Sequence, residues 1–230
     1  MGDGVAYSQA QSELTKVAEQ LGAEVYDADS GEVNISYAHP LYQGATGHMF
    51  GSQSRPITEK GDVNLICGTY ILPEVFPELI PIFNPSAKVI HIDLNSYEIG
   101  KNHRVDLGIV SDPKLTLAEL SKLLTEKTTP EQKNQAEARV REIGAAKQAK
   151  IEKAIADDQL VKNDVPLDFS NFTAELAARL PEDAIIFDEA LTGSPALTRY
   201  FPPIKTGAVF PDSRRFPWGR YSRGDRRKVG

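Results

Sequence analysis

A turn near residue 190 combines residue types that suit an anion. Ala184–Phe187 is predicted as a strand and Pro195–Tyr200 as a helix, with the turn between them. Backbone N–H groups at a helix N-terminus, together with a hydroxyl such as that of Thr192, favour a phosphate-bearing ligand. The alternative is that Thr192 or Ser194 only caps the helix. The candidate binding residues are Glu189, Leu191, Thr192 and Gly193.

Asp93 is a second candidate, because it ends the predicted strand Lys88–Asp93. An acid at this place in a Rossmann-like fold can bond the ribose of a nucleotide. The alternative is a strand-end carboxylate held in a turn. No Ser-His-Asp or Cys-His grouping is legible, so we predict no catalytic residue. The histidines do not cluster at ligand spacing, so packing roles and no metal site are expected for His39, His48, His91 and His103.

The composition is that of an ordinary folded protein. The 230 residues are 40% apolar and 25% charged, which excludes a disordered or collagen-like chain. No apolar run is long enough to span a membrane, and the N-terminus does not resemble a signal peptide. Cys67 is the only cysteine, which excludes a disulfide framework and a thiolate metal cluster. We therefore expect a cytoplasmic protein in which Cys67 is a small buried side chain.

Strands and helices alternate in the first half of the chain. A helix over 9–21 is expected to begin with a capping box of Ser8 and Gln11, and another helix follows Asp112 and Pro113 and buries leucines on one face. Residues 28–58 are expected to form an irregular connection with weak strands. The predicted strands are 24–26, 62–67, 88–93 and 105–110. This order predicts an α/β, Rossmann-like domain with a largely parallel sheet over residues 1–125, with the strand before Gly2 missing.

The second half is predicted to hold a connector and an incomplete domain. Thr129 and Gln132 open a long, polar helix to about Asp158, and residues 126–169 are expected to be an exposed connector and linker. Residues 170–207 are expected to begin a second α/β unit, in which a helix buries Phe172, Leu176 and Leu180 and a single strand follows. Residues 208–230 are a basic tail. From Ile204 onward there are eight Lys/Arg and two Asp, a charge of +6, so the preceding residues carry −12 and the net charge is −6.

Three segments carry a family resemblance. His39–Gly44, Gly61–Gly68 and Ile90–Asn102 resemble, in this order, the central domain of thiamine-diphosphate-dependent enzymes of the acetolactate synthase and benzoylformate decarboxylase type. Leu180–Tyr200 resembles the start of the diphosphate-binding domain of the same family.

The resemblance implies a larger enzyme. Its relatives have an N-terminal domain with an activating glutamate, a central domain, and a domain that holds thiamine diphosphate through Mg²⁺ with a Gly-Asp-Gly motif and a later Asn. They make or break C–C bonds next to the carbonyl of 2-oxo acids, assemble as dimers or tetramers, and in some members bind FAD or ADP. By this comparison the chain is a fragment truncated at both ends, inactive and without cofactor on its own.

The first and last segments of the chain each carry a pattern that could mislead. Gly2-Asp3-Gly4 and Asn34 match the magnesium motif by count, but the family's central domain commonly opens with such a turn, so no metal is expected there. Reading the codons from Val209 one base later permits a Gly-rich string that resembles the family's next segment. We therefore predict that the basic tail is a frameshift product.

The alternative from another class is a stand-alone Rossmann-like nucleotide-binding or interaction module with a basic C-terminal arm. In that arm Trp218, Tyr221 and the arginines resemble a single-strand nucleic-acid patch. The incomplete sheet of the second unit argues against this alternative, and we expect no nucleic-acid binding.

Overall fold

The computed structural model describes residues 1–28, 30–47, 49–72, 74–181, 184, 186–188 and 193–204, and the backbone of 209–211. Every strand pairing among these residues is parallel. The central sheet has the order β3-β4-β5, formed by Val63–Cys67, Lys88–Asp93 and Leu107–Val110. Its register joins Leu65 to Ile90 and Ile90 to Leu107. The predicted α/β class with parallel pairing is confirmed.

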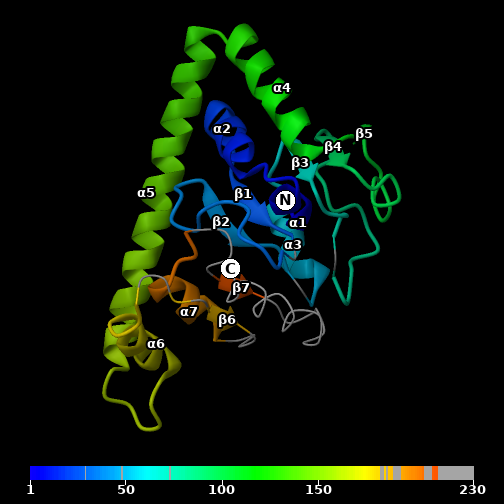
Figure 1. Cartoon of the computed structure of the whole chain (residues 1–230). Coiled ribbons are helices and arrows are strands. Elements are labelled where there is room, and N and C mark those ends of the chain that lie inside the picture. The colour runs from blue at the N-terminus through cyan, green and yellow to red at the C-terminus, as the bar shows by residue number, and fades with distance from the viewer. Residues whose placement is uncertain are drawn as a thin grey trace, which may run out of the picture.

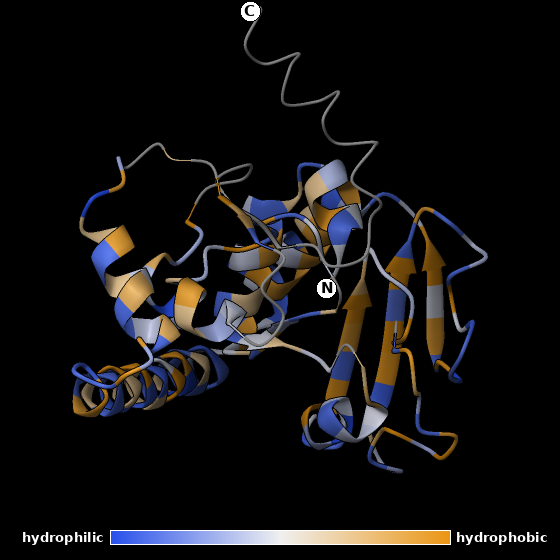
Figure 2. Cartoon of the chain, turned by 90° about the horizontal axis from the view of Figure 1, so that it is seen from below, coloured by the Kyte–Doolittle hydropathy of each residue, from blue (hydrophilic) through white to orange (hydrophobic). Residues whose placement is uncertain are grey.

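Helices cover one face of this sheet. α1 is Asp3–Tyr7, α2 is Gln11–Leu21 and α4 is Pro113–Lys127. The main apolar cluster joins these helices to the strands through Val5, Leu14, Val17, Cys67, Ile92 and Leu117, each at most 7% exposed. Figure 2 shows the three strands side by side, with hydrophobic colour over most of their length. A second cluster, with Ile71, Leu72, Ile82 and Val89, packs on the other side. Both faces are therefore apolar, as a parallel sheet requires.

The remaining strands form two smaller sheets of two strands each. β1 (Val25–Asp27) pairs with β2 (Tyr42–Ala45), and β6 (Ile186–Asp188) pairs with β7 (Val209–Pro211). The second unit therefore has two paired strands where the sequence predicted a single one, and β7 lies inside the segment predicted to be the basic tail. The pairing of β6 with β7 joins segments more than 20 residues apart, so no local sequence pattern predicts it.

The long helix α5 (Pro130–Leu160) runs along one side of the molecule, from the end beside α2 and α4 to α6 (Figure 1). The predicted capping box of Thr129 and Gln132 is present. Only Ala136 and Asp158 of α5 are buried, which confirms a helix with little core of its own. It ends beside α6 (Phe169–Ala177), which packs against α7 (Ser194–Tyr200).

Several local predictions were wrong. Ser8 follows α1, and α2 begins after Ala10 without a side-chain cap, so there is no capping box of Ser8 and Gln11. Residues 28–58 contain the helix α3 (Gly51–Thr58), which tertiary hydrogen bonds hold in a Gly- and Ser-rich segment. On α6 the buried side chains are Ser170, Asn171 and Thr173, whereas the predicted core residue Phe172 is 48% exposed.

A close approach of two backbones explains the glycines near the N-terminus. The amides of Gly2 and Gly4 donate to the carbonyls of Cys67 and Gly68 at 3.0 and 2.9 Å. A Cβ on Gly4 would lie 2.6 Å from the Cα of Gly68, and Gly68 itself has φ +67°. The Gly2-Asp3-Gly4 turn is therefore used for packing against the end of β3.

Candidate functional site

The predicted anion-binding turn lies between β6 and α7, and the structure describes its two ends. Glu189, Leu191 and Thr192 lie outside the described residues, so their binding role stays a prediction. Gly193 precedes α7, and its carbonyl accepts from the amides of Ala196 and Leu197 at 3.0 and 3.1 Å. A Cβ on Gly193 would lie 2.7 Å from the ring of Phe169, so a side chain at this position would displace that ring of α6.

The other end of the turn is Asp188, which was not predicted as a site residue. Asp188 ends β6 and is 5% exposed. Burial raises the pKa of Tyr37 above its ordinary range, and the charges of Asp27 and Asp188 act in the same direction. Tyr37, from the first half of the chain, therefore lies in the electrostatic field of the residue that begins the predicted turn. Only the position of Asp188 at the carboxyl end of a strand could have indicated it.

Tyr37 belongs to a buried tyrosine–aspartate cluster. Its ring stacks on that of Tyr42 with centroids 4.1 Å apart and planes at 21°. The Tyr42 hydroxyl donates to the Asp27 carboxylate at 3.0 Å, and Asp27 is 2% exposed. Burial raises the pKa of Asp27, against the opposing effects of the Met1 amino group and of hydrogen bonds from neighbouring hydroxyls. The cluster joins Asp27 at the carboxyl end of β1 to Tyr42 at the start of β2.

Backbone bonds connect this cluster to the second unit and to α5. The Tyr37 amide donates to the Pro203 carbonyl at 2.8 Å. Lys147 of α5 donates from Nζ to the carbonyls of Tyr37 and His39 at 2.6 and 2.7 Å, and its ammonium lies 5.5 Å from the ring centroid of Tyr42. Burial lowers the pKa of Lys147. Residues 37–39 are therefore the place where the first half, the long helix and the second unit meet.

Asp93 makes the contacts of a strand-end turn. Its Oδ1 accepts from the Asn95 amide at 2.7 Å, and its carbonyl accepts from the Ser111 amide at 3.0 Å. Nearby, the ammonium of Lys101 lies 4.7 Å from the ring centroids of both Tyr70 and Tyr97. These contacts join the loops that follow β3 and β4. They account for Asp93 as a turn residue, and its nucleotide role stays a prediction.

The side chains of Asp3 and Asn34 accept hydrogen bonds from backbone amides. Asp3 Oδ1 accepts from the amides of Gly31 and Glu32 at 2.8 and 3.0 Å. Asn34 is fully buried, accepts from the Ala6 amide at 2.9 Å and donates to Ser30 Oγ at 2.9 Å. Both side chains thus fasten the loop 30–34 to α1. Across the residues that the structure describes, no group of three His, Cys, Asp or Glu side chains could hold a metal ion.

Cys67 and His91 have packing roles. Cys67 is 1% exposed, and burial raises the pKa of its thiol to about 12, which removes its nucleophilic character. His91 is fully buried, its Nε2 lies 2.7 Å from the Thr69 carbonyl, and its Nδ1 accepts from the Gly100 amide at 3.3 Å. The packing role predicted for His91 is confirmed, while His48 lies outside the described residues.

An open groove of about 550 Å³ lies where α2 meets residues 33–36 and Ile204. Its floor has the buried side chains of Val33 and Ile35, and its rim is polar. The rim residues are Gln11, Ser12, Thr15, Lys16, Glu19 and Ser36. Among the described helices, none combines the length and the apolar content needed to cross a bilayer.

Comparison with known proteins defines the class. Residues 1–120 match the family model of the thiamine pyrophosphate enzyme central domain, and the chain belongs to this family. It is 37% identical over 123 residues to a probable acetolactate synthase large subunit of Methanococcus aeolicus, a stretch that covers 54% of this chain and 20% of that protein. It is 31% identical over 138 residues to the acetolactate synthase large subunit of Cyanidium caldarium, a stretch that covers 60% of this chain and 23% of that protein. The matched part spans about a fifth of the length of these relatives.

Solved structures share the fold. Benzoylformate decarboxylase of Polynucleobacter necessarius superposes with a TM-score of 0.67 at 17% identity, over 91% of this chain and 36% of that chain. The 4-hydroxybenzoylformate decarboxylase of Rhodococcus jostii RHA1 gives a TM-score of 0.63, also at 17% identity, with the same coverage. The shared fold extends well past residue 120 and therefore includes the long helix.

Proposed function

We propose that the chain is the central domain and the first part of the diphosphate-binding domain of a thiamine diphosphate enzyme. The whole enzyme would make or break a C–C bond next to the carbonyl of a small 2-oxo acid. The observation that carries this proposal is the match of residues 1–120 to the family, supported by a shared fold over 91% of the chain. The names of the relatives, acetolactate synthase and benzoylformate decarboxylase, support 2-oxo acid chemistry.

The proposed division of the chain has four parts. Residues 1–125 are the central domain, 126–169 the connector, 170–207 the start of the diphosphate-binding domain, and 208–230 a frameshift product. The burial pattern supports the first boundary, because the apolar clusters consist of residues before the connector apart from Val140 and Ile143 at their edge. Sequencing the DNA past the codon of Phe201 tests the last part. We expect a shifted frame that encodes Gly-Asp-Gly and a later Asn, and its absence would make the tail genuine.

The proposed cofactor wall is the turn between β6 and α7, of which the structure describes Gly193. When bound, thiamine diphosphate supplies carbanion chemistry, and the protein orients the cofactor. Glu189, Leu191, Thr192 and Gly193 would hold the diphosphate. The described residues do not fit Mg²⁺, because Asp3 accepts from the backbone of the loop 31–32, Asn34 accepts from the backbone of α1, and no group of three His, Cys, Asp or Glu side chains among them could hold a metal ion. No reaction step is therefore assigned to this chain.

Isolated, the chain is proposed to be cytoplasmic and inactive, while the whole enzyme forms dimers or tetramers. Thermal shift assays with thiamine diphosphate plus Mg²⁺, with ADP and with FAD test this directly, beside assays of pyruvate and benzoylformate turnover. We expect no thiamine diphosphate binding at micromolar concentration and no turnover. Turnover by this chain alone would contradict the proposed inactivity. Stabilisation by ADP or FAD would show that the chain binds a nucleotide.

A further inference from the structure

Asp158 stands in an unfavourable place for a carboxylate. It lies two residues before the end of α5, where the helix dipole is negative and disfavours an acidic side chain. It is also 9% exposed, so water does not compensate its charge. Most of α5 is solvent-exposed, and Ala136 is its one other buried residue. The burial of Asp158 therefore needs a partner from another element.

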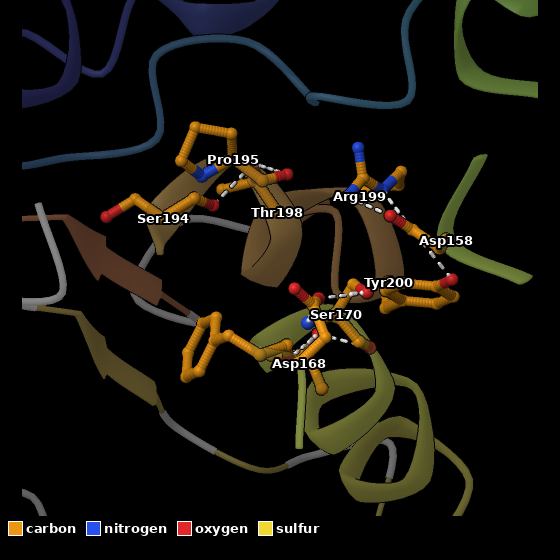
Figure 3. A network of polar contacts seen from close by, with 10 residues as sticks. Asp158, Asp168, Ser170, Ser194, Pro195, Thr198, Arg199 and Tyr200 are labelled. Atoms are coloured by element: carbon orange, nitrogen blue, oxygen red, sulfur yellow. Dashed lines mark hydrogen bonds and ion pairs between the residues drawn. The ribbon is translucent and has the colours of Figure 1, made fainter. Parts of the chain in front are cut away.

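That partner is the last turn of α7. Arg199 donates a hydrogen bond from Nη2 to Oδ1 of Asp158 at 3.0 Å, and its Nε lies 2.9 Å from Oδ2 as an ion pair without hydrogen-bond geometry (Figure 3). Tyr200 donates its hydroxyl to Oδ2 at 2.9 Å. The side chains of Arg199 and Asp158 are only 19% and 12% exposed. The guanidinium therefore brings its charge to both carboxylate oxygens while making one hydrogen bond, and this partly buried ion pair is the contact that offsets the charge of Asp158.

The same region ties in α6. Asn171 of α6 donates to the carbonyl of Val161, which directly follows α5, at 2.9 Å. Asp168 precedes α6 and accepts from the amide and hydroxyl of Ser170, and these bonds, with a smaller effect of the Arg199 charge, lower the pKa of Asp168. Figure 3 shows the contacts of Asp168 with Ser170 beside those of Asp158 with Arg199 and Tyr200. The three helices thus meet through polar side chains.

We propose that Asp158, Arg199 and Tyr200 form a docking joint, in which α7 supplies the charge and the hydroxyl that the end of α5 requires. The last turn of α5 and the whole of α7 are then ordered together and released together, while the central domain stays folded. The joint does not depend on any cofactor, so it stands apart from the proposed function. It decides whether the second unit stays on the connector helix.

Amide hydrogen exchange of the full chain, followed by mass spectrometry, tests the joint. Arg199→Gln removes the positive charge from a buried Asp158 at the negative end of a helix and leaves it only the hydroxyl of Tyr200. We expect exchange about tenfold faster or more in α7 and in the last turn of α5, with α4 and β4 unchanged. The matched control is Arg179→Gln, because Arg179 pairs with Glu175 on α6 with side chains 70% and 66% exposed. It should leave every segment within about twofold of the parent chain.

A second variant separates this joint from ordinary loss of packing. Asp158→Asn also frees α7, because Arg199 loses its partner. It removes the negative charge of Asp158 from the negative end of α5, so the amides of the last turn of α5 should exchange more slowly than in Arg199→Gln. The double variant should show the same slower exchange at α5 with α7 still fast. If Arg199→Gln fails to fold, Tyr200→Phe should give a smaller acceleration in the same two segments. The joint is refuted if exchange rises equally in β4, if α7 stays protected, or if the double variant is the fastest at α5.

Discussion

The two halves of the molecule are held together by different kinds of contact. In the central domain, large apolar side chains such as Leu41, Ile71, Ile92 and Leu117 are at most 1% exposed. In the described part of the second unit, the buried apolar side chains are Leu197 and Pro203, and Ser170, Asn171, Thr173 and Asp188 are buried polar residues. Burying one aliphatic side chain contributes about 1.5–3 kcal/mol, whereas a hydrogen bond contributes about 0.5–1.5 kcal/mol net. Apolar burial therefore stabilises the first half, and specific polar contacts attach the second.

The contrast predicts that the same substitution has global effects in one half and local effects in the other. Leu117→Ala removes a fully buried side chain between α4 and the central sheet, and should lower the free energy of unfolding by about 2–5 kcal/mol. Urea unfolding followed by circular dichroism measures this loss. Leu115→Ala, at a position 70% exposed on the same helix, should change it by less than about 0.5 kcal/mol. Equal losses at the two positions would contradict the assigned core.

Leu197→Ala sharpens the comparison, because it makes the same chemical change in α7. We expect a cost of about 2 kcal/mol, near the lower end of the range for such a truncation, since Leu197 is 8% exposed. Hydrogen exchange should accelerate in α6 and α7 and leave β4 and α4 protected. Acceleration throughout the central domain would show that the two halves unfold as one unit.

Lys147→Met tests the contact between α5 and residues 37–39. The carbonyls of Tyr37 and His39 would lose their ammonium donor, at an expected cost of about 1 kcal/mol because the site is partly exposed. The amides of residues 37–42 should exchange faster. Lys150→Met, on an exposed part of the same helix, should have no measurable effect. A similar response to both substitutions would remove the specific role given to Lys147.

The smallest effect concerns acid stability. Burial lowers the pKa of His91 in the folded protein, against the opposing Thr69 carbonyl and the charges of Asp93 and Glu98. The unfolded chain therefore binds this proton more readily, and stability falls as the pH drops through and below about 6.5. The melting temperature of His91→Gln should fall less between about pH 7.5 and 5.5 than that of the parent chain. If the melting temperatures of the two proteins fall equally, His91 is not a source of the acid sensitivity, because His103 is present in both proteins.

The sequence predicted best where local chemistry decides the structure. Asp112 followed by Pro113 gave the start of α4, and Thr129 with Gln132 gave the start of α5. The strand at 88–93 was predicted with the observed bounds, because it is built around the β-branched residues Val89, Ile90 and Ile92. These features depend on neighbours along the chain, so a single sequence contains them.

Predictions failed where distant contacts decide. α3 forms in a segment rich in Gly and Ser because Phe76 and Ile82 accept its hydrogen bonds. Tyr37 and Asp188 share one electrostatic site although 150 residues separate them. Phe172 was predicted to be buried from the helical period, but α6 turns its polar side to α5 through Asn171. No pattern within one segment contains such pairings.

The central claim is that the second unit is attached by polar joints to a central domain that is stable without it. Native-state hydrogen exchange of the parent chain at increasing urea concentration tests this most directly. We expect α6 and α7 to exchange at urea concentrations that leave β4 and α4 fully protected, through an opening that exposes little surface. If all four elements lose protection together with the same dependence on urea, the two halves form one cooperative unit and the claim is wrong.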